Sequence, residues 1–179
     1  MKNICVFSTA CDVADKYKKD TIRIGKLIAK NKYNLVWGGT NMGLMKITAD
    51  TVKKHGGKIF GVTMEALKKN RRMDADEMTI AKDVIERKQL LIKKADAIVL
   101  LSGGIGGMDE MFDSLELKKE DLHSKPIVLM NTDNFYLGLK IQFKRMKDDG
   151  FMPEDLTKLV FFADTPAQTI NYIRSKLNK

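Results

Sequence analysis

Short apolar runs alternate along the chain with longer stretches of helical periodicity. The apolar runs lie at 4–7, 35–37, 59–62, 97–101, 127–130 and 159–162. Each is continuous rather than alternating, which is typical of strands buried on both faces of a parallel sheet. Helices are predicted between them at 14–31, 42–55, 84–95, from the turn near 105 to about 122, at 135–146, and from Pro166 onward. Pro166 suits the first helical position, where its missing N–H costs nothing.

This alternation predicts an α/β fold, a Rossmann-like doubly wound parallel sheet in a single domain that spans residues 1–179. The segment 64–82 is polar and basic and has no clear periodicity. It is predicted to be a mobile loop or a short helix near the carboxyl ends of the strands. Loops this long in a compact domain are often functional.

Composition narrows the classes of function. The chain is 44% hydrophobic and 31% charged, as in an ordinary folded protein. No apolar run approaches the roughly 20 residues that span a bilayer, and the first run is too short for a signal peptide. A cytoplasmic protein without a membrane partner is therefore expected. Two cysteines and two separated histidines predict neither a disulfide scaffold nor a metal site.

The formal charge of +9 favours an anionic partner. The lysines are spread along the predicted helices, and aromatic residues make up only 7% of the chain. Few aromatic platforms are thus available to stack bases. A nucleic-acid partner is not expected, and a small anionic metabolite is favoured instead.

Three turns follow the predicted strands at their carboxyl ends, at Ser8–Ala10, Gly38–Met45 and Ser102–Glu110. The second and third run through glycines into a helix. Glycine allows a close approach to a phosphate, and a helix N-terminus offers free N–H groups and partial positive charge. One such turn could serve chain reversal alone, but two neighbouring turns favour anion binding. Neither turn has the dinucleotide fingerprint or a Walker lysine, so NAD binding and P-loop hydrolysis are disfavoured.

These segments are similar to those of a known family. The sequence W-G-G-T-N-M-G-L-M-K at Trp37–Lys46 resembles the G-G-G-x-x-G-L-M-G motif of the LONELY GUY (LOG) family. E-R-K at Glu86–Lys88 matches its Arg-Lys pair, and S-G-G-I-G-G-M-D-E at Ser102–Glu110 resembles its P-G-G-x-G-T-x-x-E motif. The resemblance extends from Val6 to about Phe151.

The resemblance implies a cofactor-free phosphoribohydrolase that forms a homodimer. Such enzymes cleave cytokinin riboside 5′-monophosphates, and often AMP, into free base and ribose 5-phosphate. Arg87 and Glu110 fall on the family's catalytic positions. The expected substrate-binding residues are Ser8, Gly39, Thr40, Gly43, Met45, Lys88, Gly103, Gly104, Gly106 and Gly107. Relatives labelled as lysine decarboxylases are discounted, because no lysine here has a pyridoxal-phosphate context.

The proposed chemistry suits these side chains. Cleavage of an N-glycosidic bond passes through an oxocarbenium-like sugar, whose charge a carboxylate can stabilise or whose attacking water it can activate. The helix N-terminus is expected to keep Glu110 ionised. Arg87 could hold the phosphate or assist the departing base. The simpler alternatives are that Glu110 caps the helix and that Arg87 is a surface cation.

Several positions depart from the family pattern. Ser102 replaces its proline, Gly107 its threonine, and Thr40 and Lys46 two of its glycines; Glu116-Leu117 replaces its Thr-Trp pair. The last change is expected to alter the base pocket or the dimer face. The alternative function is a non-catalytic protein on the same scaffold that binds a nucleotide or molybdenum cofactor.

Overall fold

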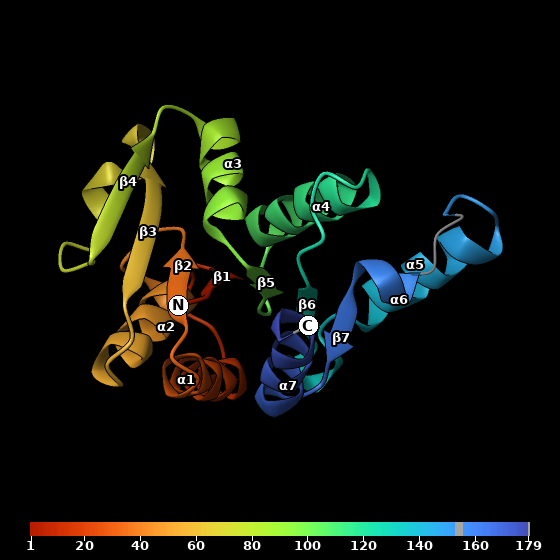
Figure 1. Cartoon of the computed structure of the whole chain (residues 1–179), viewed down its shortest axis with the longest axis horizontal. Helices are drawn as coiled ribbons and strands as arrows, with labels where there is room; N and C mark the ends of the chain where they lie inside the picture. The colour runs from red at the N-terminus through yellow and green to blue at the C-terminus, as the bar shows by residue number, and fades with distance from the viewer. Residues whose placement is uncertain (153–155, 179) are drawn as a thin grey trace.

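The computed structural model describes residues 1–152 and 156–178. Its strands form one parallel sheet in the order β4-β3-β2-β1-β5-β6-β7 (Figure 1). The strands are β1 (Asn3–Phe7), β2 (Asn34–Trp37), β3 (Ile59–Met64), β4 (Glu77–Ala81), β5 (Ala97–Leu100), β6 (Ile127–Met130) and β7 (Phe161–Ala163). The predicted doubly wound α/β fold is thereby confirmed.

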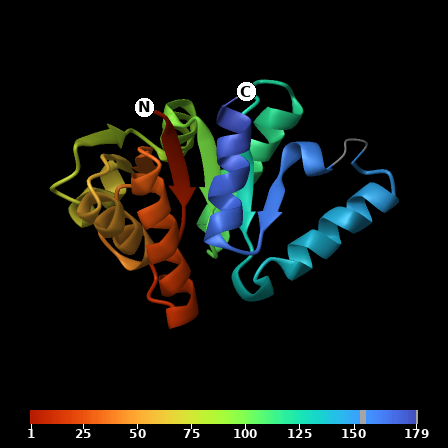
Figure 2. The same ribbon diagram turned by 60° about the horizontal axis from the view of Figure 1, so that its bottom comes forward.

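Helices cover both faces of the sheet. They are α1 (Asp15–Lys30), α2 (Gly43–Lys54), α3 (Val84–Lys94), α4 (Ile105–Lys119), α5 (Leu137–Asp148), α6 (Leu156–Leu159) and α7 (Pro166–Leu177), with 3-10 helices η1 (Glu65–Asn70) and η2 (Thr132–Asn134). Helices α1, α2 and α7 pack on one face, with α1 and α7 in front in Figure 2, and α3, α4 and α5 pack on the other. No helix of the described residues is long and apolar enough to cross a membrane.

The core explains why the strands read as unbroken apolar runs. In β1, Ile4 and Val6 face the α1 side of the sheet, while Cys5 and Phe7 face the α3 side. All four side chains are buried. Because successive residues of a strand point to opposite faces, a strand covered on both sides needs apolar residues throughout.

Side-chain caps fix the beginnings of two helices. Asp83 accepts a hydrogen bond from the Glu86 N–H at 2.8 Å and caps α3. Thr165 accepts from the Gln168 N–H at 3.2 Å and caps α7, in which Pro166 is the first residue as predicted. The cap of α3 matters for function because that helix carries Arg87.

The direction of winding changes between β1 and β5. The chain moves outward from β1 through β2 and β3 to β4, and then crosses back to β5, β6 and β7. At such a switch point the loops leave neighbouring strands in opposite directions and open a crevice at the carboxyl ends, where α/β proteins bind ligands. The turns after β1 and β5 are two of the three chosen from sequence.

Two expectations from the sequence are corrected. The segment 64–82 holds η1 but also strand β4, which pairs in parallel with β3 from Glu77 to Ala81. Only Ala81 of this edge strand is buried, so its sequence lacks the apolar run of a central strand. The last strand begins at Phe161 rather than 159, because the Val160 N–H donates to Leu156 O and extends the helical turn of α6.

Candidate active site

A cavity of about 530 Å³ lies at the carboxyl edge of the sheet, beside the switch point. Eight of the residues chosen from sequence line it: Ser8, Thr40, Met45, Arg87, Gly104, Gly106, Gly107 and Glu110. The other lining residues are not among the predicted site residues. Thr9, Ala10, Met42 and Ile105 belong to the three predicted turns, whereas Cys11, Leu67 and Asn70 lie outside them. The cavity therefore joins the turns after β1, β2 and β5 with η1 and α3.

The first turn of α4 opens into this cavity. Its first helical hydrogen bond runs from the Met108 N–H to Gly104 O at 3.1 Å. The N–H groups of the three residues that start a helix have no acceptor within it, and they carry partial positive charge. Those of Ile105, Gly106 and Gly107 are thus available to an anion in the cavity.

Helix α2 begins against the turn that follows β1. Gly43 has a φ of +53°, and a Cβ at this position would overlap the carbonyl group of Ala10. The Met45 N–H donates to Thr9 O at 3.3 Å and holds the two turns together. Gly43 is therefore required by its backbone conformation and by the close approach of the Ser8–Ala10 turn.

Backbone hydrogen bonds hold η1 beside the second glycine turn. The Asn41 N–H donates to Asn70 O at 3.0 Å, and the Arg72 N–H donates to Gly39 O at 2.8 Å. These bonds bring Leu67 and Asn70 to the cavity wall. The length and polarity of segment 64–82 were the sequence signal for this contribution, although the two residues were not identified.

An arginine–glutamate pair lies at the bottom of the cavity. Arg87 on α3 is 8% exposed and Glu110 on α4 is 5% exposed. Arg87 Nη1 donates to Glu110 Oε1 at 2.6 Å, Nε donates to Val62 O at 3.1 Å, and Nη2 donates to Gly38 O at 3.4 Å. The carboxylate and the ends of two strands thus fix the guanidinium group. Arg87 is not the surface cation of the simpler alternative, and Glu110 bonds a side chain rather than the helix start.

Gly38 leaves the space that this arginine occupies. A Cβ on Gly38 would overlap Nη2 of Arg87 and would lie 3.2 Å from the terminal methyl carbon of Met45. The glycines of this turn are expected from sequence only to let a phosphate approach closely. Its first glycine instead lets a side chain from α3 pass beneath the turn to reach Glu110.

Burial and Arg87 act in opposite directions on Glu110. Burial raises the pKa of the Glu110 carboxyl, and the charge and hydrogen bond of Arg87 lower it without cancelling the rise. Glu110 is the sixth residue of α4. The expectation that the helix N-terminus keeps Glu110 ionised is therefore corrected: the ionised form is favoured mainly by Arg87.

A buried serine also faces the cavity. Ser8 is 4% exposed, and its Oγ has no hydrogen-bond partner among the described residues. An unpaired buried hydroxyl costs about 1–3 kcal/mol. A ligand oxygen in the cavity would remove that cost, which makes Ser8 a suitable binding group.

Four of the residues chosen from sequence lie outside the cavity lining: Gly39, Gly43, Lys88 and Gly103. Lys88 Nζ contacts Asp109 at 3.1 Å and Asp113 at 2.7 Å, and these bonds raise the pKa of Lys88. Lys88 therefore links α3 to α4. Gly39 and Gly43 have positive φ and shape the turn behind the cavity wall.

Comparison with known sequences identifies relatives of this chain. The model of a family described as "Possible lysine decarboxylase" matches residues 45–173. The chain is 32% identical over 155 residues to the cytokinin riboside 5′-monophosphate phosphoribohydrolase of Rhodococcoides fascians, covering 84% of this chain and 78% of the relative. It is 31% identical over 166 residues to the probable cytokinin riboside 5′-monophosphate phosphoribohydrolase LOGL1 of Oryza sativa, covering 90% and 74%.

Solved structures share the fold. The molybdenum cofactor binding protein of Rippkaea orientalis superposes with a TM-score of 0.78 at 21% identity, covering 98% of this chain and 97% of that one. The molybdenum cofactor carrier protein of Chlamydomonas reinhardtii gives a TM-score of 0.75 at 24% identity, covering 99% of both chains. At these identities the likeness establishes the shared architecture alone.

Proposed function

Because the chain belongs to the LOG family, whose sequence model is described as "Possible lysine decarboxylase", we propose that it hydrolyses the N-glycosidic bond of a nucleoside 5′-monophosphate. The substrate is AMP or an N6-modified AMP, and the products are the free base and ribose 5-phosphate. One observation carries this proposal: the buried Arg87–Glu110 pair lies in the same cavity as the first turn of α4.

The phosphate binds at the start of α4 in this proposal. The free N–H groups of Ile105, Gly106 and Gly107 donate to its oxygens, and the partial charge of the helix start favours the anion. The Ser8 hydroxyl supplies one further donor from the turn after β1. A nucleoside without the phosphate loses these contacts.

The ribose then lies next to Glu110. As the bond between the anomeric carbon and the base nitrogen breaks, positive charge develops on the sugar, and the ionised carboxylate stabilises it. Water adds to the anomeric carbon, and its proton is transferred through Glu110 or solvent to the departing base.

Arg87 is best described as a positioning residue. Three of its nitrogen atoms already bond Glu110 and the carbonyl groups of Val62 and Gly38. This arrangement favours orientation of the carboxylate over the two roles expected from sequence, which are holding the phosphate and assisting the departing base. Its charge also keeps a buried carboxylate ionised.

The rim of the cavity is apolar where the base would extend. Met42 is 49% exposed and Ile105 is 90% exposed, and both line the opening together with Leu67. Apolar side chains at this position suit an alkyl group on the base, since its burial is favourable by about 25 cal/mol per Å². This supports an N6-modified AMP as the better substrate.

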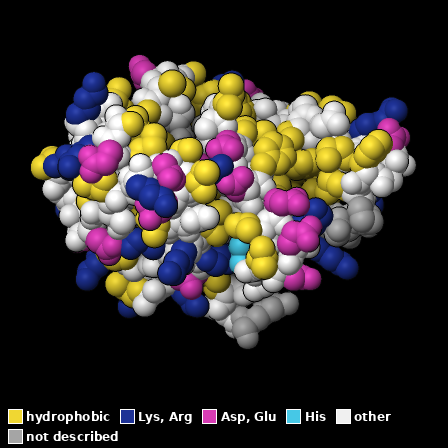
Figure 3. All heavy atoms as spheres, turned by 90° about the horizontal axis from the view of Figure 1, so that it is seen from above, with side chains coloured by type: hydrophobic (Ala, Val, Ile, Leu, Met, Phe, Trp, Pro, Cys, Tyr) yellow, Lys and Arg dark blue, Asp and Glu magenta, His cyan; other side chains and the backbone are white. Residues whose placement is uncertain are grey.

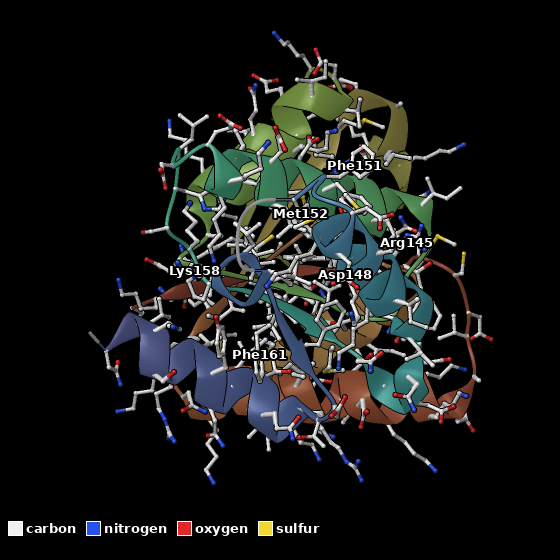
Figure 4. All side chains as sticks on the ribbon, turned by 90° about the vertical axis from the view of Figure 1, so that its right-hand side faces the viewer. Arg145, Asp148, Phe151, Met152, Lys158 and Phe161 are labelled. Atoms are coloured by element: carbon white, nitrogen blue, oxygen red, sulfur yellow. The ribbon has the colours of Figure 1, made fainter. Side chains whose placement is uncertain are left out.

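A homodimer is part of the proposal. Hydrophobic side chains gather over the α4 and α5 side of the molecule (Figure 3). Phe112 is 42% exposed, Ile141 61% and Phe151 79%. Phe151 and Met152 also line an apolar pocket of about 260 Å³ between α4 and α5 (Figure 4). Exposed apolar surface of this kind marks an interface, and two-fold symmetric dimers are the commonest oligomers.

The test is to incubate the purified protein, without added metal, with AMP, an N6-alkylated AMP and adenosine. Each of the two nucleotides should yield free base and ribose 5-phosphate in a 1:1 ratio. Adenosine should remain intact. Nucleotide that is bound but recovered unchanged would favour the alternative of a carrier or sensor. Equal rates on adenosine and AMP would refute the phosphate site.

A further inference from the structure

A second and larger cavity lies at the amino ends of β6 and β7, on the opposite edge of the sheet from the candidate active site. Its volume is about 780 Å³. The last turns of α4 and α7, the loop before β6 and helix α6 form its walls. Lys158 of this cavity lies between α4 and α7 in Figure 4. We call it the basic cavity because Lys118, Lys119, Lys158 and Lys176 line it.

These lysines differ in whether a carboxylate neutralises their charge. Lys119 contacts Glu116 and Glu120, both at 2.9 Å. Lys118 is half-buried and donates to Leu159 O at 3.0 Å, and Lys176 lies 5.4 Å from the Tyr172 ring centroid. Among the described residues, neither Lys118 nor Lys176 has a carboxylate oxygen within 4.0 Å. Asp121 is the one carboxylate among the described residues that line the cavity, so Lys118, Lys158 and Lys176 leave it with a surplus of positive charge.

Burial is the main cause of the lowered pKa of two groups in the cavity, and neighbouring lysines add to it. Burial and the charge of Lys176 lower the pKa of Lys118. Burial and the charges of Lys125 and Lys118 lower the pKa of His123, which also lines the cavity. The C-termini of α4 and α7 contribute partial negative charges of roughly one half each, which offset part of the positive charge of the lysines. An anion in the cavity would relieve this repulsion.

The basic cavity also has an apolar wall. The Tyr172 ring stacks on Phe161 with ring centroids 4.3 Å apart and an angle of 6° between the planes. Tyr172, Pro126 and Leu159 line the cavity next to the lysines. The volume lies in the range of about 300–1,000 Å³ that is typical of small-molecule sites and exceeds what a single phosphate needs.

We propose that the basic cavity binds a small organic phosphate with two or more phosphoryl groups, whose oxygens contact Lys118, Lys158 and Lys176 and whose apolar part packs against Tyr172. This site is separate from the candidate active site, which is proposed to take a monophosphate. It would allow a polyphosphorylated metabolite to bind at the other edge of the same sheet.

The test uses inorganic pyrophosphate and ADP as probes at a constant ionic strength of about 0.15 M, since free salt screens exposed charges. Calorimetry gives the affinity, and backbone amide chemical shifts locate the site. We expect shifts at Ser124 and Tyr172, besides shifts at the start of α4 where the proposed active site also accepts phosphate. Binding followed at Ser124 and Tyr172 should be at least tenfold weaker in Lys118→Met. ADP should bind more tightly than pyrophosphate because of its apolar part.

The matched control is Lys144→Met, which removes the same charge from α5, where Lys144 pairs with Asp148 at 2.5 Å. Its affinity should equal that of the wild type. Lys176→Gln, at an exposed position, is a second variant that should also weaken binding. The proposal would be overturned if both cavity variants bound with wild-type affinity, or if the chemical shift changes were confined to Gly106 and Gly107. Tighter binding of a short oligonucleotide at these lysines would also overturn it. None of these readouts depends on hydrolysis of AMP.

Discussion

Glu110→Gln separates the charge of the carboxylate from its shape. The glutamine retains an oxygen that can accept from Arg87 Nη1, which lies 2.6 Å from Glu110 Oε1 in the wild type. If the carboxylate stabilises the oxocarbenium-like sugar, kcat should fall about 100-fold or more, which is typical of a lost acid–base group and equals about 3 kcal/mol. Nucleotide affinity should largely persist, because it depends mainly on the start of α4.

The substitution also affects stability. Removing one partner of a buried ion pair costs about 3–5 kcal/mol when the other charge is left alone. Here the glutamine oxygen and the carbonyl groups of Val62 and Gly38 still accept from Arg87. The expected loss is therefore at most about 1 kcal/mol, the net contribution of one hydrogen bond, because the neutral glutamine does not bear the cost of burying a charge. This corresponds to a fall in Tm of roughly 2–4 °C for a domain of this size. Assays run well below the lowered Tm therefore compare two folded proteins.

Asp109→Asn is the matched control, because it makes the same chemical change one residue earlier on α4. The Asp109 side chain is 49% exposed and pairs with Lys88 at 3.1 Å. Exposed ion pairs contribute about 1 kcal/mol or less, so this variant should keep wild-type kcat. Steady-state kinetics and titration of AMP give both quantities. If Glu110→Gln turns over like the wild type, the proposed mechanism is wrong.

The pH profile gives an independent readout of the same residue. Burial raises the pKa of Glu110 above 4.5 despite Arg87, so kcat/KM should increase with pH through a value above 4.5. The raised pKa also means that the contribution of Glu110 to stability is present below the unfolded pKa and is lost as pH rises through the folded pKa. Glu110→Gln should abolish the part of the pH dependence of the unfolding free energy that Glu110 contributes, and Asp109→Asn should retain it.

Three further variants and one control, Gly138→Ala, test the site and the dimer. Gly38→Ala should reduce kcat at least tenfold because its Cβ displaces the Arg87 guanidinium. Gly138→Ala, whose Cβ meets no heavy atom of the described residues within 4 Å, should keep kcat and stabilise α5 by up to about 1 kcal/mol. Steady-state kinetics and thermal unfolding of both glycine variants test this expectation, and equal kcat values would contradict the positioning role of Arg87. Arg87→Met should leave Glu110 buried without its partner, raise the pKa of that carboxyl and move the acid limb of kcat/KM to higher pH. Ile141→Ser should shift the molar mass in light scattering from dimer to monomer at micromolar concentration, and a wild-type protein that is monomeric there would refute the dimer.

Much of the fold follows from local sequence. The run Ala97–Leu100 is apolar at every position because helices cover both faces of β5, and it was correctly identified as a strand. Strand β4 was missed because an edge strand with a single buried residue shows no such run. The start of β7 was misplaced because the same apolar stretch serves a helical turn at Val160 and then the strand.

The site was predictable only in part. Glycine turns at strand ends located the cavity, since their chemistry is local. The pairing of Arg87 with Glu110 joins two helices that are separated by strand β5, and periodicity carries no information on such a contact. The role of Gly38 likewise depends on a side chain from α3, and Lys88 turned out to face the carboxylates of α4 instead of the cavity.

The most direct test of the proposed mechanism is a crystal structure of Glu110→Gln with AMP bound. We predict that the phosphate contacts the N–H groups of Gly106 and Gly107 and that the anomeric carbon lies within roughly 3–4 Å of the residue 110 side chain, near the distance needed for reaction. A nucleotide whose phosphate sits at the start of α4 but whose glycosidic bond points away from residue 110 would contradict the catalytic role of Glu110. A nucleotide found only in the basic cavity would contradict the proposed active site itself.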